Sequence, residues 1–319
     1  LVLVLNIYIF MEEDVILKVD HLSHRYSAAW ALRNVSFEVR KHDICGLLGP
    51  NGAGKSTVMN IICGIVRQSD GKVSVAGIDV LKHPLEAKAH IGFLPQNPPI
   101  YADFTVEEYL RHAAEIRRVP DREIPKAMDE VLELCGITHF RKRLLSNLSG
   151  GYKQRVGIAQ AIIHKPDLVI FDEPTNGLDP TQVLGVRRLL REIAQNSTVL
   201  ISTHILSEVQ AVCNKIVMVN RGKTIFKGST SDFDNSIVPD SIFLKVQPEP
   251  ALEEVQAITG VTGAEALGDG SFRVRFGDDT EVLENIVAVA ASKGWHLEEM
   301  GVERSSMDAV FAALTKQQH

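Results

Sequence analysis

The stretch GPNGAGKST, residues Gly49–Thr57, decides the fold of this chain. It has a glycine, a gap of four residues and then Gly54, Lys55 and Ser56, which is the spacing of a loop that wraps around phosphates. Glycines let successive backbone N–H groups turn inward toward the phosphates, because no Cβ obstructs them. Lys55 adds a positive charge, and Ser56 adds a hydroxyl for Mg²⁺. The stretch therefore predicts a loop that binds a nucleotide.

The segments on either side of the loop agree with this prediction. Ile44–Leu48 is a short apolar run that predicts a strand, and apolar residues from Val58 to Ile65 recur at helical spacing. Strand, glycine loop and helix in this order form the setting that a phosphate loop requires. A glycine turn that matched the pattern by chance would need neither neighbour.

A second group of residues is expected beside the loop. Strand-like runs at Leu168–Phe171 and Thr198–Ser202 flank a helical pattern at Thr181–Ala194, and this βαβ order predicts a parallel sheet. Asp172 and Glu173 end the first run, so they are expected at the sheet edge where ligands bind. Neighbouring strand residues point to opposite faces, so Asp172 can hold Mg²⁺ while Glu173 activates the attacking water. Without the phosphate loop, such a pair is as typical of solvated side chains.

The other segments of this part of the chain predict the layers around the sheet. Residues 15–45 alternate apolar and polar in short runs, which predicts antiparallel strands. Residues 105–147 carry helical patterns without strand signals. The turn residues Asn220–Gly222 lie between two β-rich runs and predict a hairpin that closes the first domain.

The C-terminal part predicts a second, smaller domain. Residues 231–240 are rich in Ser, Asp and Pro and are expected to form a linker. Residues 241–319 follow the order strand, helix, strand, strand, helix, strand, which predicts a small α+β ferredoxin-like accessory domain with a last helix at Met307–Leu314. This part has 6 Lys and Arg against 13 Asp and Glu, a balance of −7, which leaves +1 for the rest of a chain of net charge −6. That acidity argues against a nucleic-acid partner.

The overall composition is that of an ordinary globular protein, with 45% hydrophobic and 23% charged residues. No stretch approaches the roughly 20 apolar residues of a membrane-spanning helix. If the protein moves a cargo across a membrane, another chain is therefore expected to supply the pore. Residues 1–13 are expected to be an N-terminal extension. The cysteines form no CxxC pair, and we expect buried thiols in a reducing cytoplasm at Cys45, Cys63, Cys135 and Cys213.

One further motif makes the class of protein specific. The stretch LSGGYKQR, Leu148–Arg155, resembles the signature motif of the ATP-binding cassette family, and it stands between the phosphate loop and Asp172 as it does in that family. The resemblance covers about residues 14–230. It implies a P-loop NTPase cassette, in which a RecA-like parallel sheet core carries an antiparallel β subdomain and a helical subdomain at about residues 97–165. Tyr152 and Lys153 depart from the polar pairs that many members have there.

The resemblance also implies a role for individual residues. Tyr26 is similar to the aromatic that stacks on adenine, Asp179 to the D-loop aspartate, and Gln96 and His204 to the Q-loop glutamine and the switch histidine. The signature residues are expected to complete the site of a second copy: Leu148, Ser149, Gly150, Gly151 and Gln154. Expected catalytic residues are Lys55, Gln96, Glu173 and His204, and Mg²⁺ is expected at Ser56, Gln96 and Asp172. Nucleotide contacts are expected from Tyr26, Gly49, Pro50, Asn51, Gly52, Ala53, Gly54, Lys55, Ser56 and Thr57.

The function that these residues imply is that of a transporter motor. ATP would close a dimer of cassettes, expected to be a homodimer, which drives a separate membrane permease from the cytoplasmic face of the membrane. SSMDAVFAALT at Ser305–Thr315 is similar to the ending of ABC-2-type export ATPases and indicates export. The alternative is a soluble cassette ATPase that acts on ribosomes or DNA. Members that resemble the translation-factor type usually carry two cassettes in one chain, and the DNA-repair type carries coiled-coil or zinc insertions. This sequence has one cassette and shows no heptad run and no zinc-binding cysteine pattern. A non-catalytic regulatory cassette would predict damage at Glu173 or His204, and both are present.

Overall fold

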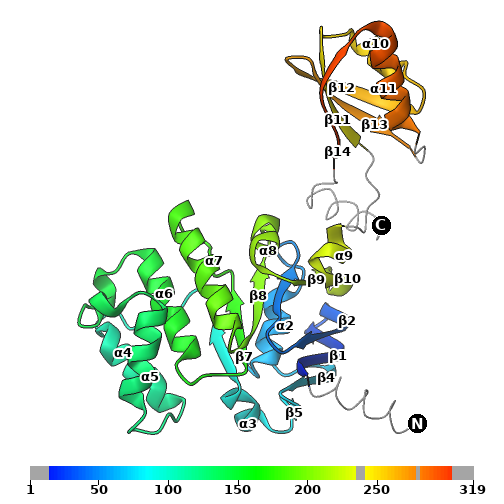
Figure 1. Cartoon of the computed structure of the whole chain (residues 1–319). Coiled ribbons are helices and arrows are strands. Elements are labelled where there is room, and N and C mark those ends of the chain that lie inside the picture. Colours follow the sequence, from blue (N-terminus) through cyan, green and yellow to red (C-terminus); the bar gives the residue numbers. More distant parts are fainter. Residues whose placement is uncertain (1–13, 235–240, 278–280, 304–319) are drawn as a thin grey trace, which may run out of the picture. The chain divides into compact units, whose positions relative to one another are not determined.

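The computed structural model describes residues 14–234, 241–277 and 281–303, and the chain divides into two compact units at Thr230 and Ser231 (Figure 1). The expected extension at residues 1–13 and the expected helix at Met307–Leu314 lie outside the described residues. Of the helices that the structure describes, none is both long and apolar enough to cross a membrane.

A six-stranded sheet forms the centre of the first unit, in the order β10-β9-β3-β8-β7-β6. Adjacent strands from β9 to β6 run parallel, and only β10 is antiparallel to its neighbour. Every residue of β3 and β7 is buried, which explains why these strands are continuous apolar runs. The strands are β3 (Ile44–Leu48), β6 (Ile91–Leu94), β7 (Leu168–Asp172), β8 (Thr198–Thr203), β9 (Lys215–Asn220) and β10 (Lys223–Ser229).

The connections confirm the predicted βαβ order and the predicted hairpin. Helix α2 (Lys55–Ile62) follows β3, α7 (Pro180–Ala194) joins β7 to β8, and α8 (Leu206–Val212) joins β8 to β9. In the turn between β9 and β10, Arg221 and Gly222 have φ values of 48° and 75°, as a two-residue turn of type I′ requires.

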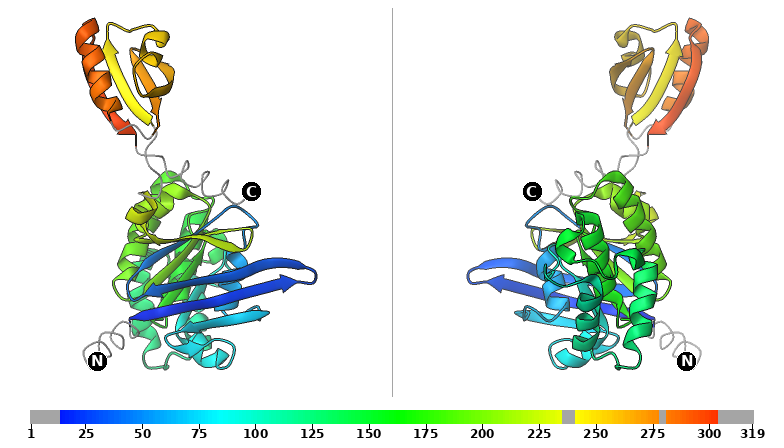
Figure 2. Two further views of the ribbon diagram at one scale, coloured as in Figure 1. Left: turned by 90° about the vertical axis from the view of Figure 1, so that its right-hand side faces the viewer. Right: turned by 90° about the vertical axis from the view of Figure 1, so that its left-hand side faces the viewer.

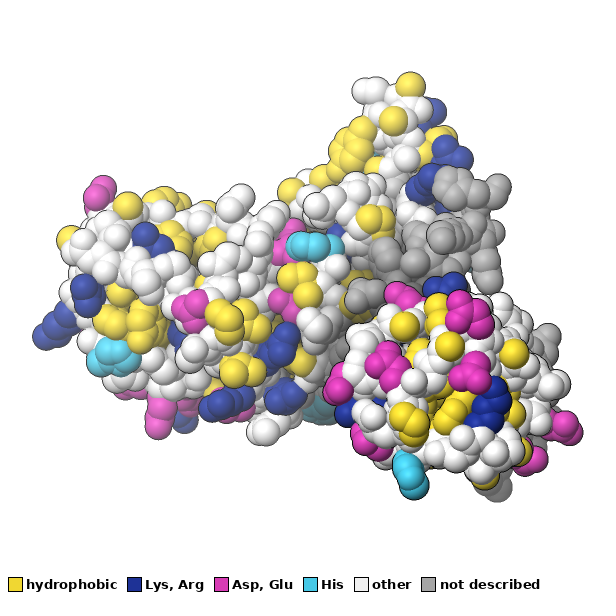
Figure 3. Space-filling view, turned by 90° about the horizontal axis from the view of Figure 1, so that it is seen from above, with side chains coloured by type: hydrophobic (Ala, Val, Ile, Leu, Met, Phe, Trp, Pro, Cys, Tyr) yellow, Lys and Arg dark blue, Asp and Glu magenta, His cyan; other side chains and the backbone are white. Residues whose placement is uncertain are grey.

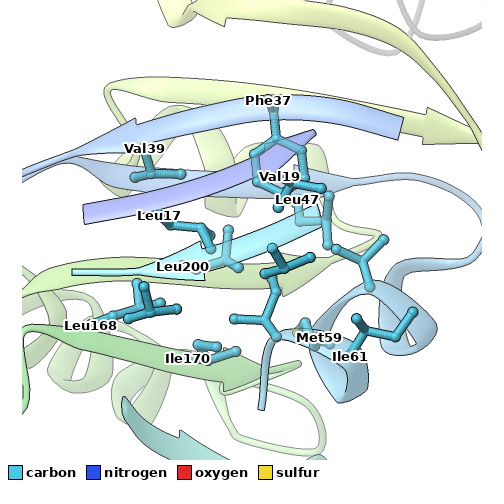
Figure 4. Close-up of a cluster of buried hydrophobic side chains, with 14 of the residues drawn as sticks. Leu17, Val19, Phe37, Val39, Leu47, Met59, Ile61, Leu168, Ile170 and Leu200 are labelled. Atoms are coloured by element: carbon cyan, nitrogen blue, oxygen red, sulfur yellow. The ribbon is translucent and has the colours of Figure 1, made fainter. Parts of the chain in front are cut away.

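The antiparallel sheet of the first unit has the order β2-β1-β4-β5. Its long β1–β2 hairpin extends away from the rest of the unit (Figure 2). Alternate residues of β1 and β2, such as Leu17 and Phe37, pack with Met59 of α2 and Ile170 of β7 in one hydrophobic cluster (Figure 4). This cluster fixes α2, and with it the phosphate loop, between the two sheets. The strands are β1 (Val15–Tyr26), β2 (Ala29–Arg40), β4 (Asp70–Val75) and β5 (Ile78–Asp79).

A helical subdomain lies between β6 and β7, as predicted. Its first helix begins with a capping box, in which the Thr105 hydroxyl accepts the Glu108 N–H and the Glu108 carboxylate accepts the Thr105 N–H. Its last helix, α6, begins at the glycine pair of the predicted signature motif. The helices are α4 (Val106–Ile116), α5 (Ile124–Leu134), η1 (Thr138–Phe140), η2 (Leu145–Asn147) and α6 (Gly150–Ile162), with the short α3 (Pro84–Ala89) before β6.

The second unit has the ferredoxin-like arrangement. In the described part of this unit the strands form one antiparallel sheet in the order β12-β13-β11-β14, and helices α10 and α11 contribute to one core with β11 and β13. Acidic side chains are spread over the face of this unit that Figure 3 shows. The elements are β11 (Ser241–Gln247), α10 (Leu252–Gln256), β12 (Val261–Gly268), β13 (Ser271–Phe276), α11 (Val282–Lys293) and β14 (His296–Glu303).

The expectation of a linker over all of residues 231–240 was wrong at its start. A short helix, α9 (Thr230–Asp234), occupies residues 231–234, and residues 235–240 lie outside the described part. The reason is Phe233, whose side chain is fully buried and so anchors a segment that otherwise has a polar sequence. One buried aromatic residue outweighs the local preference of Ser and Asp for loops.

Candidate nucleotide site

The phosphate loop is held in place by backbone contacts on both sides. At Gly49 a Cβ atom would lie only 2.2 Å from the carbonyl oxygen of Val219 in β9, so no other residue fits. Gly54 has φ 110° and precedes α2, and the amide of Gly222 donates to the Ala53 carbonyl over 2.9 Å. The loop is thus enclosed between β9 and the β9–β10 turn, with its remaining N–H groups at the start of α2, a favourable place for an anion.

Lys55 is the buried cation of the loop. Its Nζ donates to the carbonyl oxygens of Gly49 over 2.7 Å and Pro50 over 3.3 Å, and only 6% of the residue is exposed. Burial lowers the pKa of Lys55, while the carboxylates of Glu173 and Asp172 oppose this change. A cation that is already desolvated and aimed into the loop attracts phosphate oxygens strongly.

Half of the predicted site residues meet at one cavity of about 300 Å³ beside the loop. Ala31, Asn176 and Ser202 also line it, and the sequence motifs assign them no role. Ser202 is the residue of β8 that pairs with Asp172, so only the register of the sheet could have revealed it. The predicted residues that line the cavity are Asn51, Gly52, Gly54, Lys55, Ser56, Thr57, Gln96, Asp172, Glu173 and His204.

Asp172 and Glu173 stand at the carboxyl end of β7, where the sequence places them. Burial raises the pKa of Asp172, and the neighbouring Ser202 hydroxyl, Lys55 and the Ser56 hydroxyl counteract this. Glu173 has a left-handed backbone with φ 49°, and its N–H donates to the Ser202 carbonyl over 2.9 Å. This conformation turns the chain sharply after β7 and costs about 1 kcal/mol or more, which the surrounding contacts must offset.

The oxygen atoms around Asp172 fit a magnesium ion. Mg²⁺ prefers one or two carboxylates with hydroxyl, phosphate or water oxygens, and the cavity offers the Asp172 carboxylate, the Ser56 hydroxyl and the Gln96 amide. Within residues 14–234, 241–277 and 281–303, no group of three or more His, Cys, Asp and Glu side chains forms a ready-made metal site. The fit therefore depends on one buried carboxylate whose desolvation a cation would relieve.

His204 and Glu173 contact each other directly. The Nδ1 atom of His204 lies 2.9 Å from Oε1 and 3.0 Å from Oε2 of Glu173. The Glu173 side chain is 9% exposed, whereas that of His204 is 44% exposed and faces the cavity. The imidazole therefore orients a buried carboxylate, which is the arrangement that a base needs to act on a water molecule.

The signature residues do not line this cavity. Ser149 caps the N-terminus of α6 by position, but its hydroxyl makes no cap hydrogen bond within the described part of the chain. Gly150 is exposed, and a Cβ atom there would meet no described atom within 4 Å, whereas one at Gly151 would strike the Gln182 side chain. Leu148 is buried. The α6 N-terminus is therefore exposed at Ser149 and Gly150 and lies outside the cavity beside its own phosphate loop.

Three further predicted residues have structural contacts elsewhere. Gln154 is buried, and its Nε2 donates to the Pro174 carbonyl over 2.8 Å. Asp179 caps α7 by accepting the Gln182 N–H over 2.9 Å. Tyr26 is 50% exposed, and its ring lies edge-on to His24 with centroids 4.5 Å apart. The four cysteines are buried and unpaired, as predicted.

Comparison with known proteins agrees with the fold. Residues 32–176 match the family model described as ABC transporter. The chain is 37% identical to the bacitracin transport ATP-binding protein BcrA of Bacillus licheniformis, over 66% of this chain and 68% of that protein. It is 35% identical to the lipopolysaccharide export system ATP-binding protein LptB of Haemophilus influenzae, over 73% of this chain and 98% of that protein. The solved structure of cbiO1 from Clostridium perfringens, part of the ABC transporter complex cbiONQ, superposes with a TM-score of 0.65 at 30% identity, covering 70% of this chain and 92% of that chain.

The fold and the cavity define a P-loop ATPase of the cassette type. The chain belongs to the family of ATP-binding proteins of ABC transporters, and it binds and hydrolyses ATP as the motor subunit of such a transporter. Subunits of this family dimerise and work with a membrane permease.

Proposed function

We propose that two copies of this chain close on ATP and that each copy completes the other's site. Lys55 and the loop N–H groups bind the phosphates, Glu173 activates the attacking water, and His204 orients Glu173. Ser56, Gln96 and Asp172 would hold Mg²⁺, which neutralises phosphate charge when bound. Ser149, Gly150 and Gly151 of the second copy bind the same nucleotide from the other side, near Asp179. Tyr26 stacks on adenine.

The α6 N-terminus carries this proposal. Ser149 and Gly150 are exposed there, and they lie outside the cavity that their own loop forms. A helix N-terminus with an unused hydroxyl attracts an anion. A second copy can supply that anion as the γ-phosphate of its own nucleotide.

A groove between α3 and α4 offers a place for the permease. A cavity of about 680 Å³ opens between α3 and α4, and its lining includes Leu85, Tyr101 and Ile116. These side chains are 77%, 54% and 65% exposed, which is unusual for residues of this size. The segment Asn97–Phe104 follows Gln96 and contributes to this lining, so a permease bound there can respond to the state of the cavity.

We further propose that the transporter exports its cargo and that the chain acts at the cytoplasmic face of the membrane. Two relatives support the direction, since one serves bacitracin transport and the other lipopolysaccharide export. To test the direction, the gene is deleted in its host and the cell content of a panel of antibiotics and lipids is measured. Greater retention, reversed by the wild-type chain but not by Glu173→Gln, supports export. Reduced uptake would show an importer.

The composite site is tested by mixing variants. Lys55→Ala and Ser149→Arg should each abolish hydrolysis alone, and their mixture should restore it, because one of the two sites in the mixed dimer is then intact. Glu173→Gln should bind ATP, form a dimer that light scattering detects, and lose about 100-fold or more of its turnover. If Ser149→Arg remains fully active, α6 has no part in the site.

A further inference from the structure

Glu208 is a buried carboxylate outside the nucleotide cavity. It lies in α8, in the segment that follows His204, and only 8% of the residue is exposed. It does not line the cavity, and none of the roles proposed above involves it. A carboxylate is costly to bury unless hydrogen bonds compensate it, so its partners indicate what it does.

Both oxygens of Glu208 accept a hydrogen bond from a buried threonine. Oε1 accepts the hydroxyl of Thr175, and Oε2 accepts the hydroxyl of Thr203 over 2.8 Å. Thr175 and Thr203 are 7% and 1% exposed. Each hydroxyl gives its single proton to the carboxylate, and such charge-assisted bonds are stronger than those between neutral groups.

The two threonines lie beside Glu173 and His204 in the chain, one in the turn after β7 and the other at the end of β8. Thr175 follows Glu173 by two residues in the sharp turn after β7, and Thr203 immediately precedes His204. The Thr203 hydroxyl also accepts the N–H of Ile205 over 3.0 Å, so it fixes the backbone on both sides of His204. Through these contacts one side chain joins the segment of Glu173 to the segment of His204.

We propose that Glu208 is a positioning residue for ATP hydrolysis, which sets the Glu173–His204 contact by tying Thr175 to Thr203. This rests on the roles proposed above for Glu173 and His204. The left-handed backbone of Glu173 supports it, because such a conformation persists only where its surroundings fix it. Loss of the tie shifts the carboxylate away from the imidazole and leaves the phosphate loop intact.

The test separates turnover from binding. Glu208→Gln keeps the size of the side chain, but its amide nitrogen cannot accept a threonine proton. We expect kcat to fall by about 10- to 100-fold, the effect of misplacing a catalytic group by about 1 Å, while the Kd for ATP changes less than about twofold. The exposed Glu133→Gln is the matched control and should leave both values unchanged. Unchanged kcat in Glu208→Gln would overturn the proposal.

The threonines distinguish positioning from general support of the fold. Thr203→Ser retains the hydroxyl and should keep the wild-type kcat, whereas Thr203→Val should lose as much as Glu208→Gln. The double variant Glu208→Gln/Thr203→Val should be no slower than either single one, because all three break the same tie. If the losses in kcat add up in the double variant, the proposal is refuted. If Glu208→Gln does not fold, the comparison of Thr203→Ser with Thr203→Val decides alone. If Glu173→Gln and His204→Ala are as active as the wild type, the proposed function itself fails.

Discussion

Substitution of Gly49 by alanine tests how tightly the phosphate loop is enclosed. The added Cβ would lie 2.2 Å from the Val219 carbonyl oxygen and 3.2 Å from the Cβ of Ala53. An ordinary contact begins at 3.4 Å, so the Val219 oxygen would be more than 1 Å too close. This oxygen belongs to a buried strand that no rotamer change can move. Overpacking in a core costs about 1–3 kcal/mol, and this contact lies at the upper end because both partners are fixed by backbone pairing.

For a unit of this size, a loss of about 3 kcal/mol lowers Tm by roughly 6–12 °C. The assay is thermal unfolding of Gly49→Ala beside Gly150→Ala, followed by titration with a fluorescent ATP analogue. At Gly150 a Cβ would meet no described atom within 4 Å, so that variant should unfold within a few degrees of the wild type. Gly49→Ala should also bind nucleotide more weakly. Equal Tm values for the two variants would refute the reasoning.

The remaining predictions concern the second unit and one partly buried histidine. Deletion of residues 241–319 should leave ATP affinity within about twofold in a nucleotide titration, because every residue of the cavity precedes them; a folded truncation that fails to bind would contradict this. Burial, and secondarily Arg117, lowers the pKa of His164 from 6.5 to about 4. The unfolded chain therefore takes up a proton at His164 at a higher pH than the folded chain does. The contribution of His164 to the free energy of unfolding is fully present above pH 6.5, and it falls by up to roughly 3 kcal/mol as the pH drops toward 4. His164→Gln should flatten Tm over that range, and an unchanged slope would show that another group is responsible.

The sequence predicted those parts of the fold that depend on local patterns. The βαβ order, the hairpin at Asn220–Gly222 and the ferredoxin-like order of the second unit all follow from periodicity and turn residues. β6 was not predicted because four residues carry little pattern, and its place at the sheet edge depends on pairing with β7. Helix α9 was missed because its formation depends on the burial of Phe233.

In the site, too, the local motifs could be predicted from the sequence, but the contacts between distant segments could not. Motifs placed Lys55, Asp172 and His204 correctly at one sheet edge. They could not show that His204 contacts Glu173 or that Ser202 lines the cavity, because these contacts join segments about 30 residues apart through the register of β7 and β8. The role proposed for Glu208 could not be predicted for the same reason, since its partner Thr175 lies 33 residues earlier in the chain.

The contact between Gly49 and Val219 has a consequence for how small a working fragment can be. The family match ends at residue 176, but the wall behind the loop comes from β9, and the Gly222 amide that holds Ala53 comes from the turn after it. A fragment that stops between β7 and β9 would retain the sequence of the phosphate loop. It would lose the backbone of β9 and of the β9–β10 turn, which holds the loop in its conformation. Split-protein designs should therefore keep Gly49 and Val219 in one fragment, and break the chain before the phosphate loop or after the β9–β10 turn.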